Sequence, residues 1–149
     1  MNPPETHERG PRDERAPARR RVIAVLAALL TVAAGLGIRA VGDGPVTKYG
    51  GDALYTLLLY ALVLVVAPRT RPAAAAAAAL AASWAVELFQ LTGIPAELAA
   101  RSVLARLVLG TSFNPPDLFW YAVGAALGWT VHALVDRGAG RIVQRSSRW

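Results

Sequence analysis

The stretch SWAVELFQL, residues 83–91, places a carboxylate and a primary amide inside a run that is otherwise compatible with lipid. A charged side chain at the centre of a bilayer costs about 2.5–3.5 kcal/mol on insertion scales, so such residues usually face protein or water. Glu87 and Gln90 are three residues apart and share roughly one helical face, with Ser83 one turn earlier. We expect the rest of the chain to fold around these three residues, the polar stripe.

The composition is that of a small membrane protein. Of the 149 residues, 54% are hydrophobic and 17% are charged, whereas about 25% are charged in an ordinary soluble domain. A chain of this length is expected to form one compact unit. Because the chain has no cysteine, disulfides, thiolate metal sites and cysteine nucleophiles are excluded.

Four apolar runs predict four membrane spans, at about residues 22–38, 52–67, 72–91 and 116–135. The first run is just long enough to cross a bilayer, at roughly 25 Å for a helix rising 1.5 Å per residue. A cleaved signal peptide is the alternative for this run, because the small residues Ala33, Ala34 and Gly35 end it. The third run begins with seven alanines after Pro72 and should need neighbouring helices in order to insert.

Three further segments complete the predicted organisation. Residues 1–21 are rich in Pro, Glu and Arg and predict a disordered basic tail, and residues 136–149 predict a short basic cytoplasmic tail. Residues 95–110 are apolar but contain Arg101 and Arg106, which predicts an interfacial or re-entrant helix. The predicted fold is therefore an all-α, four-transmembrane-helix bundle over residues 22–135, with this segment between spans three and four.

The basic residues predict the orientation. The two tails and the turn at residues 69–71 hold twelve of the 16 Lys and Arg residues. Since basic residues favour the cytoplasmic side, we expect a multi-pass protein of the cell membrane with both termini in the cytoplasm. The end of span three and the segment before span four then lie towards the outside.

Helix signals assign simple roles to some polar residues and glycines. Asp52 is expected as an N-cap or first-turn residue of span two, and Asn114 to Asp117 (NPPD) as the start of span four. Gly124 and Gly128 form a GxxxG pattern, which permits close helix contact. Such packing occurs either inside one chain or between two chains in a homo-oligomer.

A set of polar residues is predicted to meet near the outer face. The set forms either a polar network or a ligand-binding site. Its members are Asp52, Ser83, Glu87, Gln90, Arg101, Arg106, Asp117 and Tyr121. One interpretation is a pocket for a lipid headgroup, a glycolipid or another amphiphile. The other is an internal network of ion pairs and hydrogen bonds that holds the external segment. A nearby arginine is expected to pair with Glu87 on either interpretation, because a buried carboxylate needs a partner.

Other chemistries lack support in the sequence. Neither His7 nor His132 has a second histidine or an acid at a spacing typical of metal ligands, so no metal is predicted. Phosphate-binding loops, nucleophile elbows and HExxH patterns are absent from the sequence, and no catalytic residue or cofactor is assigned. The net charge of +6 is explained by topology, so the expected partner is membrane lipid and not nucleic acid.

Residues 48–134 resemble a family of small bacterial membrane proteins, Domain of Unknown Function 2809. The resemblance is carried by YGGDALY at 49–55, ELFQ at 87–90 and Leu109-Gly110, together with six single positions: Pro95, Arg101, Phe113, Asp117, Tyr121 and Gly124. The order of ExxQ, a later Asp and GxxxG is also similar to VanZ-like proteins, which implies a helical protein of the cell envelope linked to glycopeptide resistance. Tyr55, Ala96 and Leu98 depart from the family pattern, which leaves the polar partner of the external segment open.

Three functional hypotheses remain. The first is a non-enzymatic envelope protein whose polar stripe binds a lipid-like or glycopeptide-related amphiphile or supports the structure. The second is a membrane enzyme that acts on a lipid-linked envelope substrate, with Glu87 or Asp117 as general base, although no second catalytic partner is evident. The third is a small transporter, for which the expected internal repeat is not visible.

Overall fold

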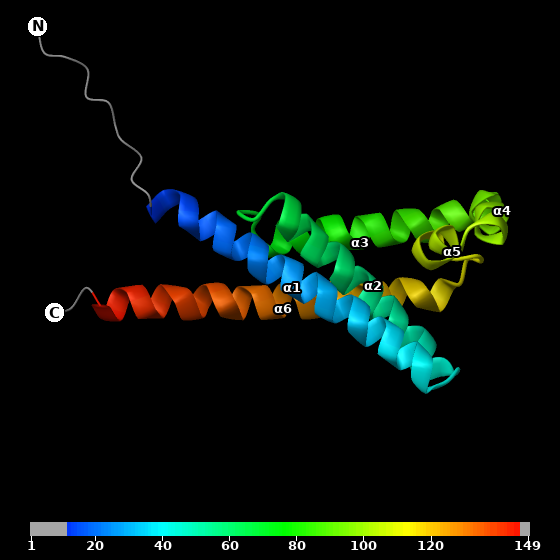
Figure 1. Ribbon diagram of the computed structural model, residues 1–149, viewed down its shortest axis with the longest axis horizontal. Helices are drawn as coiled ribbons and strands as arrows, with labels where there is room; N and C mark the ends of the chain where they lie inside the picture. The colour runs from blue at the N-terminus through cyan, green and yellow to red at the C-terminus, as the bar shows by residue number, and fades with distance from the viewer. Residues whose placement is uncertain (1–11, 147–149) are drawn as a thin grey trace, which may run out of the picture.

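The computed structural model describes residues 12–146, with side chains for residues 16–138. The chain over residues 12–146 is helical and has no strand. Its elements are α1 (Arg12–Val41), α2 (Pro45–Val66), α3 (Pro72–Phe89), the 3₁₀ turn η1 (Gln90–Thr92), α4 (Ile94–Arg101), α5 (Val103–Leu109) and α6 (Pro115–Ser146) (Figure 1). Four of these helices (α1, α2, α3 with η1, and α6) are long and apolar enough to cross a membrane, which confirms the predicted all-α fold with four spans.

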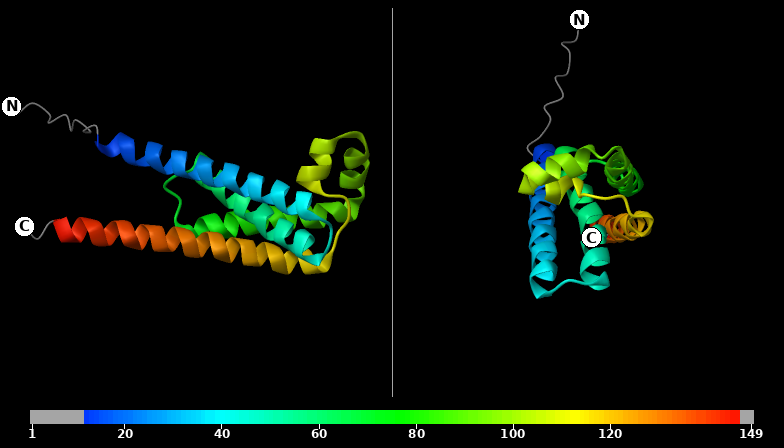
Figure 2. Two further views of the ribbon diagram at one scale, coloured as in Figure 1. Left: turned by 60° about the horizontal axis from the view of Figure 1, so that its bottom comes forward. Right: turned by 90° about the vertical axis from the view of Figure 1, so that its right-hand side faces the viewer.

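Helix α2 is the centre of the bundle. It packs against α1 on one side and against α3 and α6 on the other, and α3 also packs along α6. The two ends of the described chain lie at one end of the bundle, together with the turn between α2 and α3. The short helices α4 and α5 lie at the opposite end (Figure 2). This arrangement separates the arginine-rich segments from the α4–α5 end.

The first and last helices extend beyond the predicted spans. Residues 12–21, which we expected to be disordered, form the first turns of α1, and α6 continues past residue 135 to Ser146. The physical reason is that Ala, Arg and Glu favour helix, so a helix begun in the membrane continues through them. The remainder of the predicted tails, residues 1–11 and 147–149, lies outside the described residues.

The start of α2 differs from the sequence-based expectation for Asp52. The helix begins at Pro45, and Asp52 lies two turns inside it, so its predicted role as N-cap or first-turn residue is wrong. Proline at the first helical position is preorganised for a helix, while the paired glycines Gly50 and Gly51 are tolerated inside it. As a consequence Lys48 and Asp52 are i,i+4 neighbours on one helix face.

The segment between spans three and four is two helices instead of one. Gly93, with φ of 78°, ends the 3₁₀ turn and begins α4, and Ser102 in extended conformation separates α4 from α5. The Ser102 hydroxyl accepts a hydrogen bond from the backbone N–H of Ala105 at 3.2 Å, which caps α5. The exposed side chains of Val103 and Leu104 leave this α4–α5 segment with an apolar outer surface.

The interior between α2 and α3 is built from small and polar residues. Tyr60 packs against Ala75 and Ala79, which are fully buried. Thr56 and Ser83 are also fully buried and their hydroxyl oxygens are 2.8 Å apart. Since the Ser83 hydroxyl donates to the Ala79 carbonyl at 3.0 Å, Thr56 donates to Ser83. Ser83 thus joins α3 to α2, and within the described residues it forms no hydrogen bond with Glu87.

We predict that Thr56 and Ser83 are energetically coupled. Hydrogen bonds between membrane helices contribute about 0.6 kcal/mol on average and up to about 1.7 kcal/mol, so a double-mutant cycle of Thr56→Val and Ser83→Ala should return a coupling in that range. The measurement is unfolding of the purified protein in detergent. Thr130→Val is the control, because Thr130 bonds only to Ala126 of its own helix; additive effects of the first two substitutions would contradict the prediction.

Candidate functional site: the polar cluster at the α4–α5 end

Glu87 is the most deeply buried charged residue of the described chain, with 1% of its surface exposed. It lies in the last turn of α3. Its Oε1 accepts a hydrogen bond from the backbone N–H of Asn114 at 2.6 Å, and its Oε2 accepts one from the Tyr121 hydroxyl at 2.9 Å. Both carboxylate oxygens therefore hold the beginning of α6 against the end of α3.

A second acid, Asp117, organises the first turn of α6. Its carboxylate accepts hydrogen bonds from the Lys48 ammonium and from the Asn114 side-chain amide. The Asp117 backbone N–H in turn donates to the Asn114 carbonyl at 2.9 Å. Lys48 also lies 3.7 Å from Asp52 Oδ2. One lysine of α2 is thus shared by a carboxylate of its own helix and a carboxylate of α6.

Gln90 connects the polar stripe to the α4–α5 segment. Its side-chain Nε2 donates to the Leu109 carbonyl at 2.7 Å. The contact is close, because a Cβ on Gly110 would lie 2.6 Å from the same Nε2. Gly110 also has a φ of 67°, where L side chains are strained. Glycine at 110 therefore permits both the turn after α5 and the amide contact.

Aromatic side chains surround the cluster. The Tyr55 hydroxyl donates to the Val108 carbonyl at 3.0 Å, and the Tyr55 ring lies 6.1 Å from the Tyr121 ring. Tyr49 stacks on Trp120 with ring centroids 5.3 Å apart. Such rings supply apolar area while their polar atoms remain hydrogen-bonded. The hydrogen bond from Tyr55 to Val108 anchors α5 to α2.

Two acceptor atoms in this region are buried and lack a hydrogen-bond donor within the described side chains: Asp52 Oδ2 and Gln90 Oε1. Two of the three carboxyl groups, those of Asp52 and Asp117, share a single ammonium group, that of Lys48. We name the set Lys48, Asp52, Glu87, Gln90, Asn114, Asp117 and Tyr121 the polar cluster. It contains more acceptors than donors, so it is suited to a ligand that donates hydrogen bonds.

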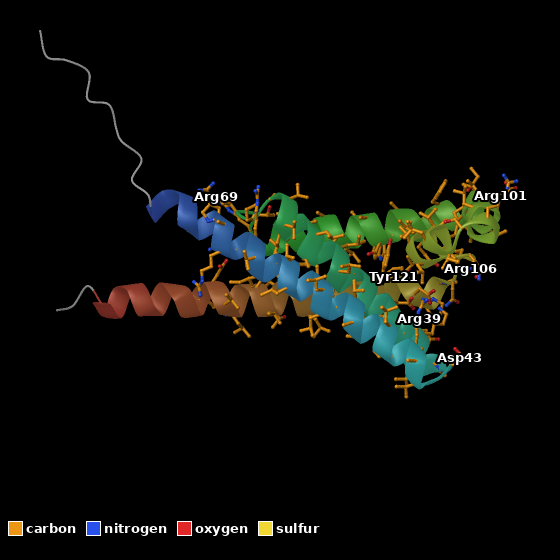
Figure 3. All side chains as sticks on the ribbon, viewed as in Figure 1. Arg39, Asp43, Arg69, Arg101, Arg106 and Tyr121 are labelled. Carbon is orange, nitrogen blue, oxygen red and sulfur yellow. The ribbon has the colours of Figure 1, made fainter. Side chains whose placement is uncertain are left out.

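The predicted arginines do not belong to this cluster. Arg101 lies at the outer tip of the α4–α5 segment, away from Tyr121 (Figure 3). The Arg106 guanidinium donates to the Ala99 carbonyl at 3.2 Å. Among the described side chains no ion pair joins either arginine to Glu87, so the arginine partner expected for Glu87 is wrong. Glu97 and Arg101 likewise form no ion pair within that range.

The sequence-based prediction missed three residues in or beside the site: Lys48, Asn114 and Tyr55. Lys48 would have been found from its i,i+4 spacing to Asp52 if the helix start at Pro45 had been recognised. Asn114 contributes a backbone N–H to Glu87, which no side-chain pattern reveals. The contact of Tyr55 is with a carbonyl of α5 and depends on the path of that helix.

The two glycines of α6 lie against α2. A Cβ on Gly124 would approach the Ala53 carbonyl oxygen to 2.3 Å, and a Cβ on Gly128 would approach the Tyr60 ring to 2.8 Å. This close approach brings Tyr121 and Asp117, one and two turns earlier, into the polar cluster. The glycine face is thereby used within the chain, and a homo-oligomer through it stays a prediction.

The cluster has no arrangement of ligands typical of a metal site. No group of three or more His, Cys, Asp or Glu side chains among the described residues is placed to hold a metal ion. Both oxygens of Glu87 and the Oδ1 of Asp117 accept hydrogen bonds from protein donors. The arrangement can bind and orient a donor group.

Comparison with known proteins identifies the family. Residues 41–125 match the family described as Protein of unknown function (DUF2809). The chain belongs to this family. No curated protein and no solved structure matches the chain. The DUF2809 match confirms the resemblance drawn from the residues, whereas the similarity to VanZ-like proteins stays a prediction.

The region of the DUF2809 match coincides with the polar cluster. It begins at the end of α1 and continues through α2, α3, α4 and α5 into the first third of α6. All seven members of the cluster, from Lys48 to Tyr121, lie inside it. Most of α1 and the second half of α6 lie outside it, so the family match describes the cluster and the helices that build it.

Proposed function

We propose that this integral membrane protein binds the head group of a lipid-like amphiphile in its polar cluster, without catalysing a reaction on it. The observation that supports this proposal is a pair of buried oxygens without a hydrogen bond from the described residues: Gln90 Oε1, and Asp52 Oδ2, which has only the Lys48 ammonium 3.7 Å away. A buried acceptor without a donor costs about 1–3 kcal/mol. A head group that carries hydroxyl or ammonium donors would recover that free energy.

The surroundings of the cluster favour an amphiphile over a small soluble ligand. The α4–α5 segment carries exposed Val103, Leu104 and Leu107, which suit the membrane interface. Tyr49 and Trp120, stacked beside the cluster, are residue types enriched at the same level. An amphiphile with its polar part in the cluster and its chain along this apolar surface satisfies both features.

The charge distribution supports a proposed location of the site in the cell. Twelve of the 16 basic residues lie in the tails and in the turn at 69–71, which supports cytoplasmic termini and a polar cluster at the outer leaflet of the cell membrane. An amphiphile of the cell envelope, including a lipid-linked or glycopeptide-related molecule, is the ligand class that this position favours.

The alternative of a membrane enzyme has less support. A general base must accept a proton from the substrate and therefore needs a free, accessible oxygen. Both oxygens of Glu87 accept hydrogen bonds from protein donors, and Asp117 accepts hydrogen bonds from Lys48 and Asn114 at its Oδ1. Glu87 therefore has no free oxygen for a substrate proton. Neither carboxylate is accompanied by a nucleophile, so binding is the function that the geometry favours.

We predict that binding depends on donor groups in the lipid and on Asp52. Nanodiscs containing phosphatidylethanolamine or a monoglucosyl lipid should raise the melting temperature of the protein more than phosphatidylcholine alone, whose trimethylammonium group cannot donate a hydrogen bond. Asp52→Asn should lose most of that difference, because its amide adds a donor to the cluster and removes a charge.

Asp43→Asn is the matched control for this experiment. Asp43 lies at the same end of the bundle, in the loop between α1 and α2, and its side chain is exposed (Figure 3). The control should keep the full lipid preference of the wild type. An equal preference in wild type and Asp52→Asn, or no preference in either, would contradict the proposal.

The envelope role is tested separately in cells. Gln90→Leu and Glu87→Gln should lower resistance to glycopeptides or to other envelope stress when the folded yield in detergent is unchanged. A loss of yield that accounts for the whole loss of resistance would instead assign both residues to structure.

A further inference from the structure

A chain of polar contacts joins all four spanning helices at the end of the bundle opposite the polar cluster. The Tyr60 hydroxyl of α2 lies 2.9 Å from Nδ1 of His132 on α6 and 3.2 Å from the Pro72 carbonyl at the start of α3. Nε2 of His132 lies 3.5 Å from Asp136 Oδ2, and Arg20 of α1 donates to Asp136 Oδ1 at 3.1 Å. We name Arg20, Tyr60, Pro72, His132 and Asp136 the histidine network.

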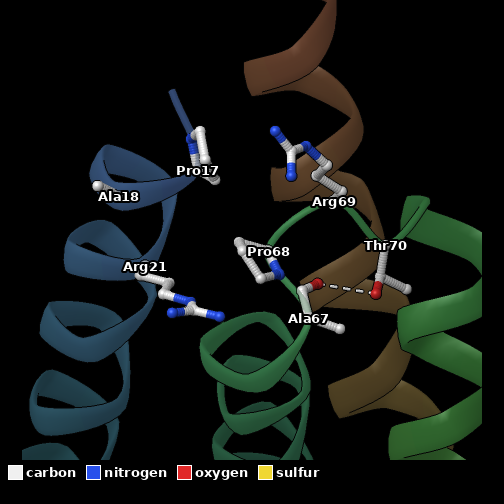
Figure 4. Close-up of a pocket in the computed structure, with 7 residues that line it drawn as sticks. All are labelled: Pro17, Ala18, Arg21, Ala67, Pro68, Arg69 and Thr70. Atoms are coloured by element: carbon white, nitrogen blue, oxygen red, sulfur yellow. Dashed lines mark hydrogen bonds between the residues drawn. The ribbon is translucent and has the colours of Figure 1, made fainter. Parts of the chain in front are cut away.

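The turn between α2 and α3 fixes the position of Pro72 relative to Tyr60. The backbone N–H and the hydroxyl of Thr70 both donate to the Ala67 carbonyl, at 3.0 and 2.8 Å (Figure 4). Pro72 then begins α3, and Tyr60 is held in the interior with only 4% of its surface exposed. Both sides of the contact between Tyr60 and Pro72 are therefore set by the fold.

The Tyr60 hydroxyl has one hydrogen but two partners. The Pro72 carbonyl is an acceptor, so the hydroxyl can meet it only as a donor. His132 Nδ1 accepts the Tyr60 hydrogen when it carries no proton, and it donates to the Tyr60 oxygen when it carries one. The charge state of His132 therefore decides which way the Tyr60 hydroxyl points.

Asp136 decides the state of the other ring nitrogen. A lone pair on Nε2 would face a carboxylate oxygen 3.5 Å away, whereas an N–H there is attracted to it. Neutral His132 therefore carries its proton on Nε2 and accepts the Tyr60 hydrogen at Nδ1. Cationic His132 carries a proton on both nitrogens, so Tyr60 turns its hydrogen to Pro72. Only the cation makes the contacts with all of its neighbours at the same time.

The charged groups around His132 come from α1, α6 and the turn after α2. Asp136 lies one turn later on α6, and Arg20 of α1 holds its other oxygen, so the acid lies between two basic groups. Arg69 of the turn has an interaction of its own. At this end α2 contributes only the Tyr60 hydroxyl, and α3 has no ionisable side chain before its last turn.

The histidine network lies where protons can reach it. Arg20 and Asp136 are just outside the predicted spans 22–38 and 116–135, and their side chains are 47% and 36% exposed. The His132 side chain is 11% exposed and lines a cavity of about 240 Å³ between α1, α2 and α6. Histidine is the side chain whose charge changes most readily between roughly pH 5 and 8.

From these contacts we infer that His132 is a proton-controlled switch in the packing of the four spanning helices. On proton uptake at Nδ1, the hydrogen bond from Tyr60 to Nδ1 breaks and one from Nδ1 to the Tyr60 oxygen forms. The freed hydrogen of Tyr60 then bonds to the Pro72 carbonyl. The protonated network joins α1, α2, α3 and α6, whereas the neutral network leaves α3 out. The switch is separate from the polar cluster and independent of its proposed ligand.

The experiment measures what the Tyr60 hydroxyl contributes at two pH values. Full-length protein in detergent is melted at about pH 5 and at about pH 8, with and without Tyr60→Phe. The hydroxyl makes two hydrogen bonds when His132 is protonated and one when it is neutral, so the loss in melting temperature should be roughly twice as large at the lower pH. In a His132→Gln background the loss should be the same at both pH values.

Two variants are matched controls. His7→Ala removes the other histidine of the chain and should leave the pH dependence of the Tyr60→Phe loss intact. Tyr55→Phe removes a hydroxyl that donates to the Val108 carbonyl, and its loss should be the same at both pH values. An equal loss for Tyr60→Phe at both pH values would overturn the switch, and so would a difference that persists in the His132→Gln background.

Discussion

Replacement of Glu87 by leucine is expected to lower the free energy of unfolding by about 2–6 kcal/mol, because two buried donors each lose their acceptor at about 1–3 kcal/mol apiece. The donors are the backbone N–H of Asn114 and the hydroxyl of Tyr121. Both lie at the start of α6, so the substitution should loosen the contact between α6 and α3. Unfolding in mixed detergent and SDS, followed by circular dichroism, measures the loss.

Two further variants test the origin of this effect. Tyr121→Phe removes one of the orphaned donors, so Glu87→Leu should cost less in a Tyr121→Phe background than in the wild type. Glu97→Leu is the control, because Glu97 is exposed on α4 and should change stability by less than about 0.5 kcal/mol. If Glu87→Leu were as mild as Glu97→Leu, the buried network would not hold α6 in place.

Introduction of a methyl group at Gly124 is expected to be the second most damaging change. A Cβ there would lie 2.3 Å from the Ala53 carbonyl oxygen, a backbone atom that cannot move without moving α2. Overpacking of this kind costs about 1–3 kcal/mol, and the separation of α6 from α2 would also withdraw Asp117 from Lys48. Gly124→Ala should therefore lower the melting temperature and reduce lipid binding at the polar cluster together.

Two other glycines are matched controls for Gly124→Ala. Gly128→Ala should cost less, because its Cβ would meet the ring of Tyr60, a side chain that can shift. Gly51→Ala should stabilise α2 by about 0.5–1 kcal/mol, since nothing lies within 4 Å of its Cβ and alanine favours helix. A different order of stability among the three variants would contradict the close packing of α2 on α6.

Some features of the candidate site could be predicted from local spacing. Glu87 and Gln90 lie on one face of a helix whatever surrounds them, and NPPD before an apolar run begins a helix at Pro115. The cost of a carboxylate in lipid then requires that Glu87 faces protein. These statements depend only on helical geometry and on the solvent properties of the bilayer, which is why the sequence sufficed.

The partners of these residues could not be predicted in the same way. We expected arginine beside Glu87, but the donors are a backbone N–H and a tyrosine hydroxyl. The cation of the site is Lys48, which falls outside the predicted second span because that span was expected to begin at residue 52, whereas α2 begins at Pro45. An error of seven residues in one helix boundary was enough to exclude the lysine from the cluster.

The sequence alone determined that this protein has four membrane-spanning helices with a buried acid near one end of the third, because hydrophobicity and the cost of a charge in lipid act on each segment separately. Only the tertiary structure decided which groups satisfy that acid, which lysine joins the cluster and which buried oxygens lack a hydrogen bond. Those features depend on the approach of α6 to α2 at Gly124 and on the path of α4 and α5. Both are set by contacts between segments far apart in the chain, which no local pattern contains.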